Sequence, residues 1–301
     1  MDKAGKKSER PGKGGMLGLR VAFVLAVFLG SGLIAPGARA DGSPSERLVR
    51  ADRKVSVDPS DPNVFWRRAE LRRESGDFEG ALEDIDAAHR LAPASPATPI
   101  LRARVFLDAG QALAALEALA PLVAAEGSPA EAQRLRAESL LRLDRPGEAA
   151  EAFSLAIESH PSPTPSLYLA RARAQTAAGG ERSQEALAGL DEAMARLGPI
   201  VSLAREAIEI EVESGNFERA LERLSAASAD ARRKETWLEW RGRVLERAGR
   251  VEEARAAYEQ ARRELALASA ISRSSSAMRA LDARLGQSLA NMPRTEKSEV
   301  D

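Results

Sequence analysis

The stretch that decides the fold is RAELRRESGDFEGALEDIDAAHRLAP, residues 68–93, because its landmarks return at a fixed interval along the chain. The pair at positions 68 and 69 reappears at Arg102-Ala103 and Arg136-Ala137, in two steps of 34 residues. A small residue twelve positions further on recurs at the same step, at Ala81, Ala115 and Ala149, and again at Ala186, Ala220 and Ala254. Self-similarity at this period is typical of stacked helix-turn-helix units, so it predicts the architecture without naming a partner.

The residue spacing inside each unit predicts two α-helices. Small and apolar residues in the second half recur at i, i+4 and i+7, as in Ala81/Ile85/Ala88 and Ala254/Tyr258/Ala261, which is one face of a helix. The first half carries a small residue that permits close approach of a neighbouring helix: Ala69, Ala103, Ala137, Ala172 or Gly242. Glycines between the halves, such as Gly76, suit the left-handed residue that ends a helix.

These units resemble the tetratricopeptide repeat family. The resemblance rests on Gly76-Asp77-Phe78-x-x-Ala81 through Pro93, on Ala149-x3-Phe153 through Pro161, and on Gly242 through Ala254-x3-Tyr258. It covers six units, 62–95, 96–129, 130–163, 165–199, 201–234 and 235–268, and it implies an all-α, right-handed α-solenoid. Two departures stand out. The early aromatic residue of the family is clear only at Phe65, and Ile208 occupies the small-residue position of the fifth unit.

Residues 1–40 are predicted to be an export signal. A basic front precedes the apolar run Val21–Leu29, which continues weakly to Ala35, and Ala38-Arg39-Ala40 has the small-x-small pattern of a cleavage site. Because the run is shorter than the ~20 residues that span a bilayer, a cleaved signal is favoured over an uncleaved membrane anchor. We therefore expect a periplasmic or extracellular protein that begins at Asp41, with Met1 or Met16 as the start.

Helices are also predicted on both sides of the array. At 41–61, Ser43 and Glu46 have the spacing of a capping box ahead of a short apolar stripe, which predicts a leading helix. At 269–293, an apolar stripe made of Met278, Leu281, Leu285, Leu289 and Met292 predicts the capping helix that the last unit of a solenoid requires. Residues 294–301 are polar and are predicted to be disordered.

Composition argues against several kinds of chemistry. The chain has no cysteine and only two histidines, His89 and His160, in different units, so neither a thiol nucleophile nor a histidine-rich metal site is expected. No recognisable catalytic or phosphate-binding string occurs. Residues 1–40 carry a net +5, so the whole-chain charge of −1 becomes −6 after signal removal, which gives no long-range attraction for nucleic acid. We expect no enzyme activity, no cofactor, no metal and no nucleic-acid partner, but a protein or peptide partner.

The resemblance places a partner-binding groove along the first helices of the units. By register, Trp66, Arg73, Arg134 and Arg205 face this groove. Trp66 is either an exposed binding hot spot or a residue that packs on the leading helix. A column of charges of alternating sign follows the same helices: Glu70, Arg104, Glu138, Arg173, Glu209 and Arg243. These charges form either a ladder of ion pairs between neighbouring units or six separately solvated groups. Relatives that grip a C-terminal carboxylate carry asparagines in this column, and their absence argues against such a ligand.

A second recurring arginine, at Arg68, Arg102, Arg136 and Arg241, is interpreted as structural, because a residue present in most units most economically serves the units themselves. In the first unit its expected partner is Asp84, a pairing that the resemblance also implies. The fourth unit contains extra residues in the connector 161–165 and at Gly179-Gly180. They are either a tolerated loop insertion or a joint between two halves of the array.

Two functions fit these observations. The first is an exported scaffold or adaptor that binds a protein or peptide in its concave groove, in an assembly of the cell envelope. The second is a structural or regulatory subunit that binds through its ends and outer surface. The fold alone does not choose between them.

Overall fold

A computed structural model describes residues 43–229, 231, 233–269 and 274–293, and this part of the chain is all-helical. Two compact units are distinguished, residues 1–47 and 48–301, and the second holds everything described below apart from the first residues of α1 (Pro44–Val57). The predicted export signal and the predicted disordered tail lie outside the described residues. No helix in the described part is both long and apolar enough to cross a membrane.

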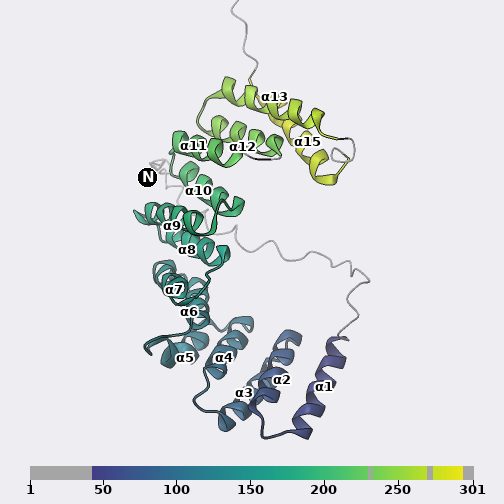
Figure 1. Ribbon diagram of the computed structural model, residues 1–301, viewed down its shortest axis with the longest axis vertical. Coiled ribbons are helices and arrows are strands. Elements are labelled where there is room, and N and C mark those ends of the chain that lie inside the picture. The colour runs from purple at the N-terminus through teal and green to yellow at the C-terminus, as the bar shows by residue number, and fades with distance from the viewer. Residues whose placement is uncertain (1–42, 230, 232, 270–273, 294–301) are drawn as a thin grey trace, which may run out of the picture. The chain divides into compact units, whose positions relative to one another are not determined.

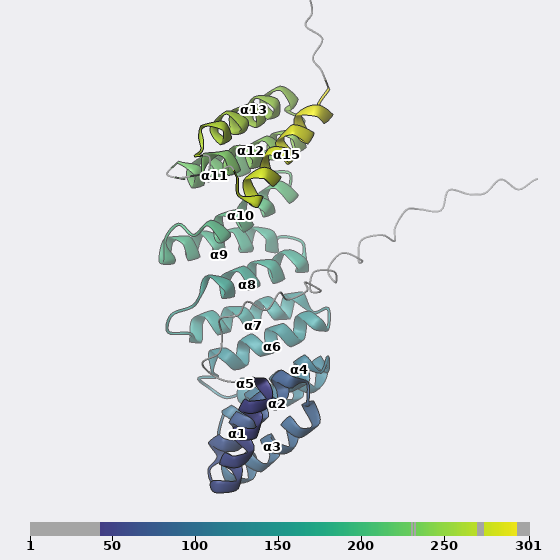
Figure 2. The ribbon, with the colours of Figure 1, turned by 90° about the vertical axis from the view of Figure 1, so that its right-hand side faces the viewer.

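Twelve of the helices form six consecutive hairpins (Figure 1). Their bounds are α2 Pro62–Ser75 and α3 Phe78–Leu91; α4 Ala97–Asp108 and α5 Ala112–Val123; α6 Ala130–Arg142 and α7 Pro146–Ser159; α8 Pro165–Ala178 and α9 Arg182–Leu197; α10 Val201–Glu213 and α11 Phe217–Ser228; α12 Lys234–Arg247 and α13 Val251–Leu267. Each helix packs on the next one (Figure 2). The first helices α2, α4 and α6 also pack directly on one another, as α8 does on α10, so the first helices form one layer and the second helices another.

A leading and a capping helix complete the array, so the predicted α-solenoid is confirmed. In α1, the Ser43 hydroxyl accepts from the Glu46 amide at 3.3 Å while the Glu46 carboxylate accepts from the Ser43 amide at 2.8 Å, which is the expected capping box. Helix α15 (Ser276–Asn291) buries Met278, Leu281 and Leu285 against the last unit.

Glycine turns and small residues set the geometry inside the hairpins. Gly76 has φ 83° and ends α2, and its neighbour Asp77 accepts from the Gly80 amide at 3.0 Å to start α3. The predicted close-approach position is fully buried at Ala69, Ala103 and Ala137. It is tightest in the sixth unit. There, a Cβ on Gly242 would lie 2.6 Å from Cδ1 of Tyr258, so only glycine fits without a shift.

The hydrophobic core is continuous across the irregular fourth unit. Phe153 on α7, Tyr168 on α8 and Leu190 on α9 belong to one buried cluster that spans the connector 161–165. The turn before α9 is also held, because Arg182 donates to the Gly147 carbonyl of α7 at 3.1 Å. Of the two interpretations of the extra residues, a tolerated insertion therefore fits the packing better than a joint. The core divides instead at three first helices, α4, α6 and α10; at α10, Ile210 belongs to this cluster and Ile208 to the next.

We expect amide hydrogen exchange to be no faster at the ends of α7 and α8 that flank the connector 160–164 than at the ends of α5 and α6 that flank 124–129. Both connectors join neighbouring units, and the first crosses a continuous core, so it offers no preferred site of local opening. Exchange followed by mass spectrometry compares the two regions in one experiment. Distinctly faster exchange on both sides of 160–164 would support the joint instead.

Candidate partner-binding site

At Arg68 and Arg102, the recurring arginine of the first helices has structural partners, as the sequence predicts. Arg68 donates to both carboxylate oxygens of buried Asp84, at 2.9 and 2.5 Å, and its Nη1 lies 3.0 Å from Asp52 of α1. The hydrogen bonds that Arg68 donates to Asp84, partly opposed by burial, raise the pKa of Arg68 above its ordinary value. Arg102 likewise reaches Asp86 of the preceding second helix at 2.5 Å. These arginines stabilise the array and are not free to bind a ligand.

Trp66 contacts the neighbouring unit. Its side chain is half-buried, packs against the core of the first two units, and donates from Nε1 to Thr98 Oγ1 of α4 at 3.3 Å. The indole therefore bridges the first helices of units one and two. Trp66 is three positions before Ala69, so the two residues share one face of α2. That face is directed at the neighbouring unit, which brings the indole to α4.

The charged column forms only one rung of the predicted ladder. Arg104 lies 3.6 Å from Glu70 of the preceding unit, within ion-pair distance. Its closer partner, however, is Glu131 at 2.7 Å, and Glu138 pairs with Arg134 on its own helix. Arg173 similarly pairs with Glu206 at 2.7 Å rather than with Glu138 or Glu209. Side chains on a helix lean toward the N-terminus of that helix. Arg104 and Arg173 therefore each meet a glutamate on the next first helix that lies one or two turns before the glutamate with which the repeat aligns them.

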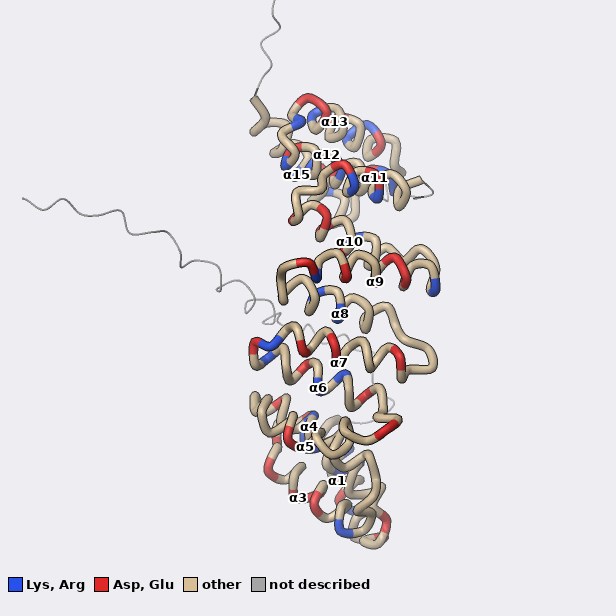
Figure 3. Tube along the Cα trace, turned by 90° about the vertical axis from the view of Figure 1, so that its left-hand side faces the viewer, with Lys and Arg blue, Asp and Glu red and all other residues tan. Residues whose placement is uncertain are grey.

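These pairs neutralise the layer formed by α2, α4 and α6. Arg73 bonds to Glu70 at 2.9 Å and also pairs with Asp108. Burial opposes ionisation of Glu131, but the hydrogen bonds from Arg134 and Arg104 outweigh it and lower the pKa of its carboxyl. Acidic and basic residues are interspersed along the described chain rather than gathered in one region (Figure 3). The predicted groove arginines in this part of the array are thus occupied by internal partners.

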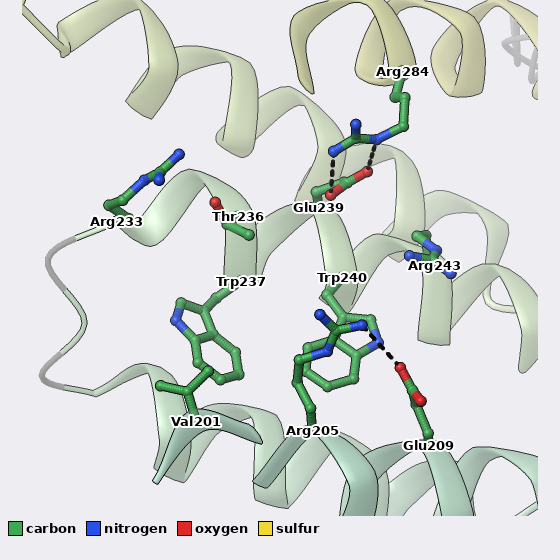
Figure 4. Close-up of a pocket in the computed structure, with 10 residues that line it drawn as sticks. All are labelled: Val201, Arg205, Glu209, Arg233, Thr236, Trp237, Glu239, Trp240, Arg243 and Arg284. Carbon is green, nitrogen blue, oxygen red and sulfur yellow. Dashed lines mark hydrogen bonds and ion pairs between the residues drawn. The ribbon is translucent and has the colours of Figure 1, made fainter. Parts of the chain in front are cut away.

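A pocket of about 430 Å³ lies at the other end of the first-helix layer (Figure 4). It is lined from α10 by Val201, Arg205 and Glu209, from α12 and the residue before it by Arg233, Thr236, Trp237, Glu239, Trp240 and Arg243, and from α15 by Arg284. Helices α10 and α12 pack on each other more sparsely than α8 and α10 do, which leaves this space between them.

Two tryptophans form the floor of the pocket. The rings of Trp237 and Trp240 stack with centroids 5.7 Å apart, and both side chains are half-buried. The guanidinium of Arg205 lies 5.6 Å from the centroid of Trp240, a cation–π distance, while it donates to Glu209 at 3.2 Å. A stacked aromatic surface that remains partly exposed is an apolar contact area with little conformational freedom to lose on binding.

The cap helix closes one side of the pocket through a buried carboxylate. Glu239, only 7% exposed, receives hydrogen bonds from Arg284 at 2.7 and 3.3 Å. The hydrogen bonding of Arg284 to Glu239 raises the pKa of Arg284 above its ordinary value. Arg243, by contrast, has no carboxylate within ion-pair distance among the residues that the structure describes, although it lines the same pocket.

A smaller apolar pocket of about 240 Å³ adjoins the first. The two share Val201 and Trp237 as a common wall. Its remaining lining comes from α9, the connector that follows it, α10 and α11: Met194, Pro199, Ile200, Ala204, Arg223, Ala226 and Ala227.

Of the residues predicted from the sequence to face a partner, the structure brings Arg205, Glu209 and Arg243 together in this pocket. The others, Trp66, Glu70, Arg73, Arg104, Arg134, Glu138 and Arg173, lie on α2, α4, α6 and α8, away from it. Trp237 and Trp240 were not expected from the sequence to face a partner. Their spacing of three residues, which puts two large aromatics on one face of a first helix, is the signal that could have found them.

The architecture defines the class of protein: an α-solenoid of helical hairpins with an open first-helix surface. No site for a metal ion, in the sense of three or more clustered His, Cys, Asp or Glu, occurs in the described part of the chain. A family model of the tetratricopeptide repeat matches residues 100–162 and 205–270. These two matches support a protein of the tetratricopeptide repeat family, as the resemblance read from the sequence predicts.

One solved structure supports this fold. The C-terminal part of a TPR repeat-containing protein from Cytophaga hutchinsonii matches with a TM-score of 0.58 at 13% identity, over 79% of this chain and 94% of that one. A tetratricopeptide repeat protein from Parabacteroides merdae matches with a TM-score of 0.46 at 16% identity, over 82% of this chain and 91% of that one. No curated protein sequence matches this one.

Proposed function

We propose that this protein is an exported scaffold or adaptor that binds a protein or peptide partner on its first-helix layer, in an assembly of the cell envelope. The family supports the general role, since tetratricopeptide arrays serve protein–protein interaction. The layout of residues 1–40 supports export. The binding surface is centred on the pocket between α10, α12 and α15, which we call the tryptophan pocket.

The observation that carries this proposal is the pair of stacked, half-buried tryptophans that lie among arginines in the tryptophan pocket. Tryptophan and arginine are the residue types most enriched at interface hot spots, which cluster where an aromatic side chain can be desolvated. Elsewhere on the described first helices, Trp66 is engaged with Thr98, and Arg73, Arg104 and Arg134 are engaged with carboxylates. The tryptophan pocket is therefore where a partner gains most from binding.

The alternative, binding through the ends and the outer surface, has weaker support. Large apolar side chains exposed on the second helices, such as Leu113 on α5 and Leu155 on α7, occur singly. Scattered exposed apolar residues are normal on protein surfaces and do not mark an interface.

Site-specific photo-crosslinking in cells tests the proposal. A photoreactive amino acid placed at Thr236, which lines the tryptophan pocket, should capture a partner, and Trp240→Ala should reduce the yield of that adduct at least tenfold. The same amino acid at Leu113, exposed on the second-helix layer, is the matched control and should capture little. Mass spectrometry of the adduct should find this chain beginning at Asp41.

Binding through the outer surface predicts the opposite pattern of crosslinking. Suppose that the photoreactive amino acid captures a partner at Leu113 but not at Thr236, and that Trp240→Ala does not reduce this capture. The outer surface would then be the binding face. If peptides from residues 1–40 were found in a membrane-bound adduct, an uncleaved membrane anchor would be favoured over a cleaved export signal.

A further inference from the structure

We infer that the tryptophan pocket and the adjoining apolar pocket together take a peptide segment in which a side-chain carboxylate lies next to a bulky apolar side chain. This inference rests on the proposed function and names the chemistry of the partner. It follows from the charge balance of the first pocket, the lining of the second, and the wall that they share.

The tryptophan pocket has one uncompensated positive charge. Among its lining residues, Arg284 is satisfied by Glu239, Arg205 by Glu209, and Arg233 by nearby Glu235 at 3.2 Å. Arg243 has no such partner in the described part of the chain. A guanidinium offers two parallel N–H donors that match a carboxylate, so a ligand carboxylate would complete this set.

The acidic residues of the pocket select a single negative charge over a polyanion. Glu209 stands beside Arg205 and is exposed, and Glu239 lies behind Arg284. A phosphate or a nucleic-acid backbone would bring several negative charges close to these two carboxylates, and like charges at short range are repulsive. One carboxylate placed at Arg243 avoids that cost.

The adjoining pocket is suited to one apolar side chain. Its volume of about 240 Å³ lies below the ~300 Å³ at which small-molecule sites begin. Its only charged lining residue, Arg223, is held by Asp191 at 2.5 and 2.8 Å and by buried Glu211 at 3.5 Å, so it is not available to a ligand. Val201, 60% exposed in the free protein, would be covered when the pocket is filled.

The shared wall joins the two requirements. Because Trp237 and Val201 line both pockets, a ligand that fills both passes over Trp237. Adjacent or next-but-one residues of an extended peptide can place a carboxylate on one side of this ring and an apolar group on the other. We assign the carboxylate to a side chain, so the test peptide below carries no C-terminal carboxylate.

Fluorescence anisotropy with defined peptides tests the inference on the folded chain. The probe is a fluorescein-labelled, C-terminally amidated peptide, Ser-Gly-Glu-Leu-Glu-Phe-Gly-Ser. We expect glutamine in place of both glutamates, or serine in place of leucine and phenylalanine, to weaken binding about tenfold or more, equivalent to about 1.4 kcal/mol. Binding of the parent peptide should also weaken as NaCl is raised.

Protein variants locate the contact. Arg243→Gln should weaken the parent peptide about tenfold and leave the glutamine peptide unchanged, because the lost partner is the carboxylate. Arg145→Gln, an exposed arginine on the opposite layer paired with Glu148, is the matched control and should change neither. Circular dichroism melting of both variants checks that they fold.

The outcomes separate the chemistry from the function. Equal affinity for the glutamate and glutamine peptides, or no effect of Arg243→Gln, overturns the carboxylate contact. Equal affinity for the apolar and serine peptides overturns the second pocket. If both the carboxylate contact and the apolar contact are overturned while Thr236 still captures a partner, the inferred ligand chemistry is wrong and the proposed function stands. Peptide binding without capture at Thr236 or Leu113 would support this inference and count against the proposed cellular role.

Discussion

Replacing Gly242 by alanine should destabilise the sixth unit by about 1–3 kcal/mol, although alanine is the better helix former. A Cβ at this position would lie 2.6 and 2.8 Å from Cδ1 and Cζ of Tyr258, closer than real Cβ contacts come. The ring cannot move aside easily, since Tyr258 is fully buried and its hydroxyl donates to Glu246 at 2.9 Å. Burial, and then that hydrogen bond, raise the pKa of Tyr258, so the phenol stays protonated and keeps its donor. Gly242→Val should cost more, because it adds volume at the same contact.

A glycine in α15 provides the matched control for Gly242. Gly286 is also inside a helix, but a Cβ there would meet nothing within 4 Å. Gly286→Ala should therefore stabilise the protein slightly, by about 0.5–1 kcal/mol, through helix propensity alone. Thermal melting and hydrogen exchange of α12 and α13 compare the two. A neutral or stabilising Gly242→Ala would show that the two helices can separate at little cost, contrary to the packing described above.

The fold could be predicted from the sequence because each unit specifies itself locally. The 34-residue period, the glycine turns and the small-residue positions all act between helices that are neighbours in the chain, and local pattern is sufficient for such contacts. Gly242 illustrates this, since it was expected to permit close approach and does so against Tyr258. Ile208 illustrates the limit. It marked the fifth unit as irregular, but only the structure shows that the core divides at its helix.

The candidate site was only partly predictable, for two physical reasons. The first is that the register along neighbouring helices does not fix which charges meet. Arg104 was aligned with Glu138 yet meets Glu131, because its side chain extends toward the helix N-terminus. The second is that the tryptophan pocket needs α15, whose Arg284 reaches a carboxylate 45 residues earlier in the chain. A contact between an irregular cap and the array has no periodic signal in the sequence.

Replacing Asp84 by alanine should destabilise the first unit by about 2–3 kcal/mol. Asp84 is 2% exposed, accepts hydrogen bonds from Arg68 and forms an ion pair with Arg72 at 3.1 Å. Its removal leaves two largely covered guanidinium groups without their shared partner, a change that costs about 3–5 kcal/mol when the charges are fully buried. The expected loss is smaller here because Arg68 keeps its contact with Asp52.

Asp86→Ala tests whether burial, rather than the loss of an ion pair as such, sets the cost of Asp84→Ala. Asp86 lies two residues away on the same helix and pairs with Arg102, but its side chain is 54% exposed. Exposed pairs contribute about 0–1 kcal/mol, so this variant should melt close to the parent protein. Because each unit of an array contacts only its neighbours, Asp84→Ala should speed hydrogen exchange in α1, α2 and α3 and leave α12 and α13 unchanged, whereas Gly242→Ala should do the reverse. Equal destabilisation by the two aspartate variants would mean that the Asp84 cluster owes little to burial, and a loss of protection spread over all six units would mean that the array unfolds as one cooperative body.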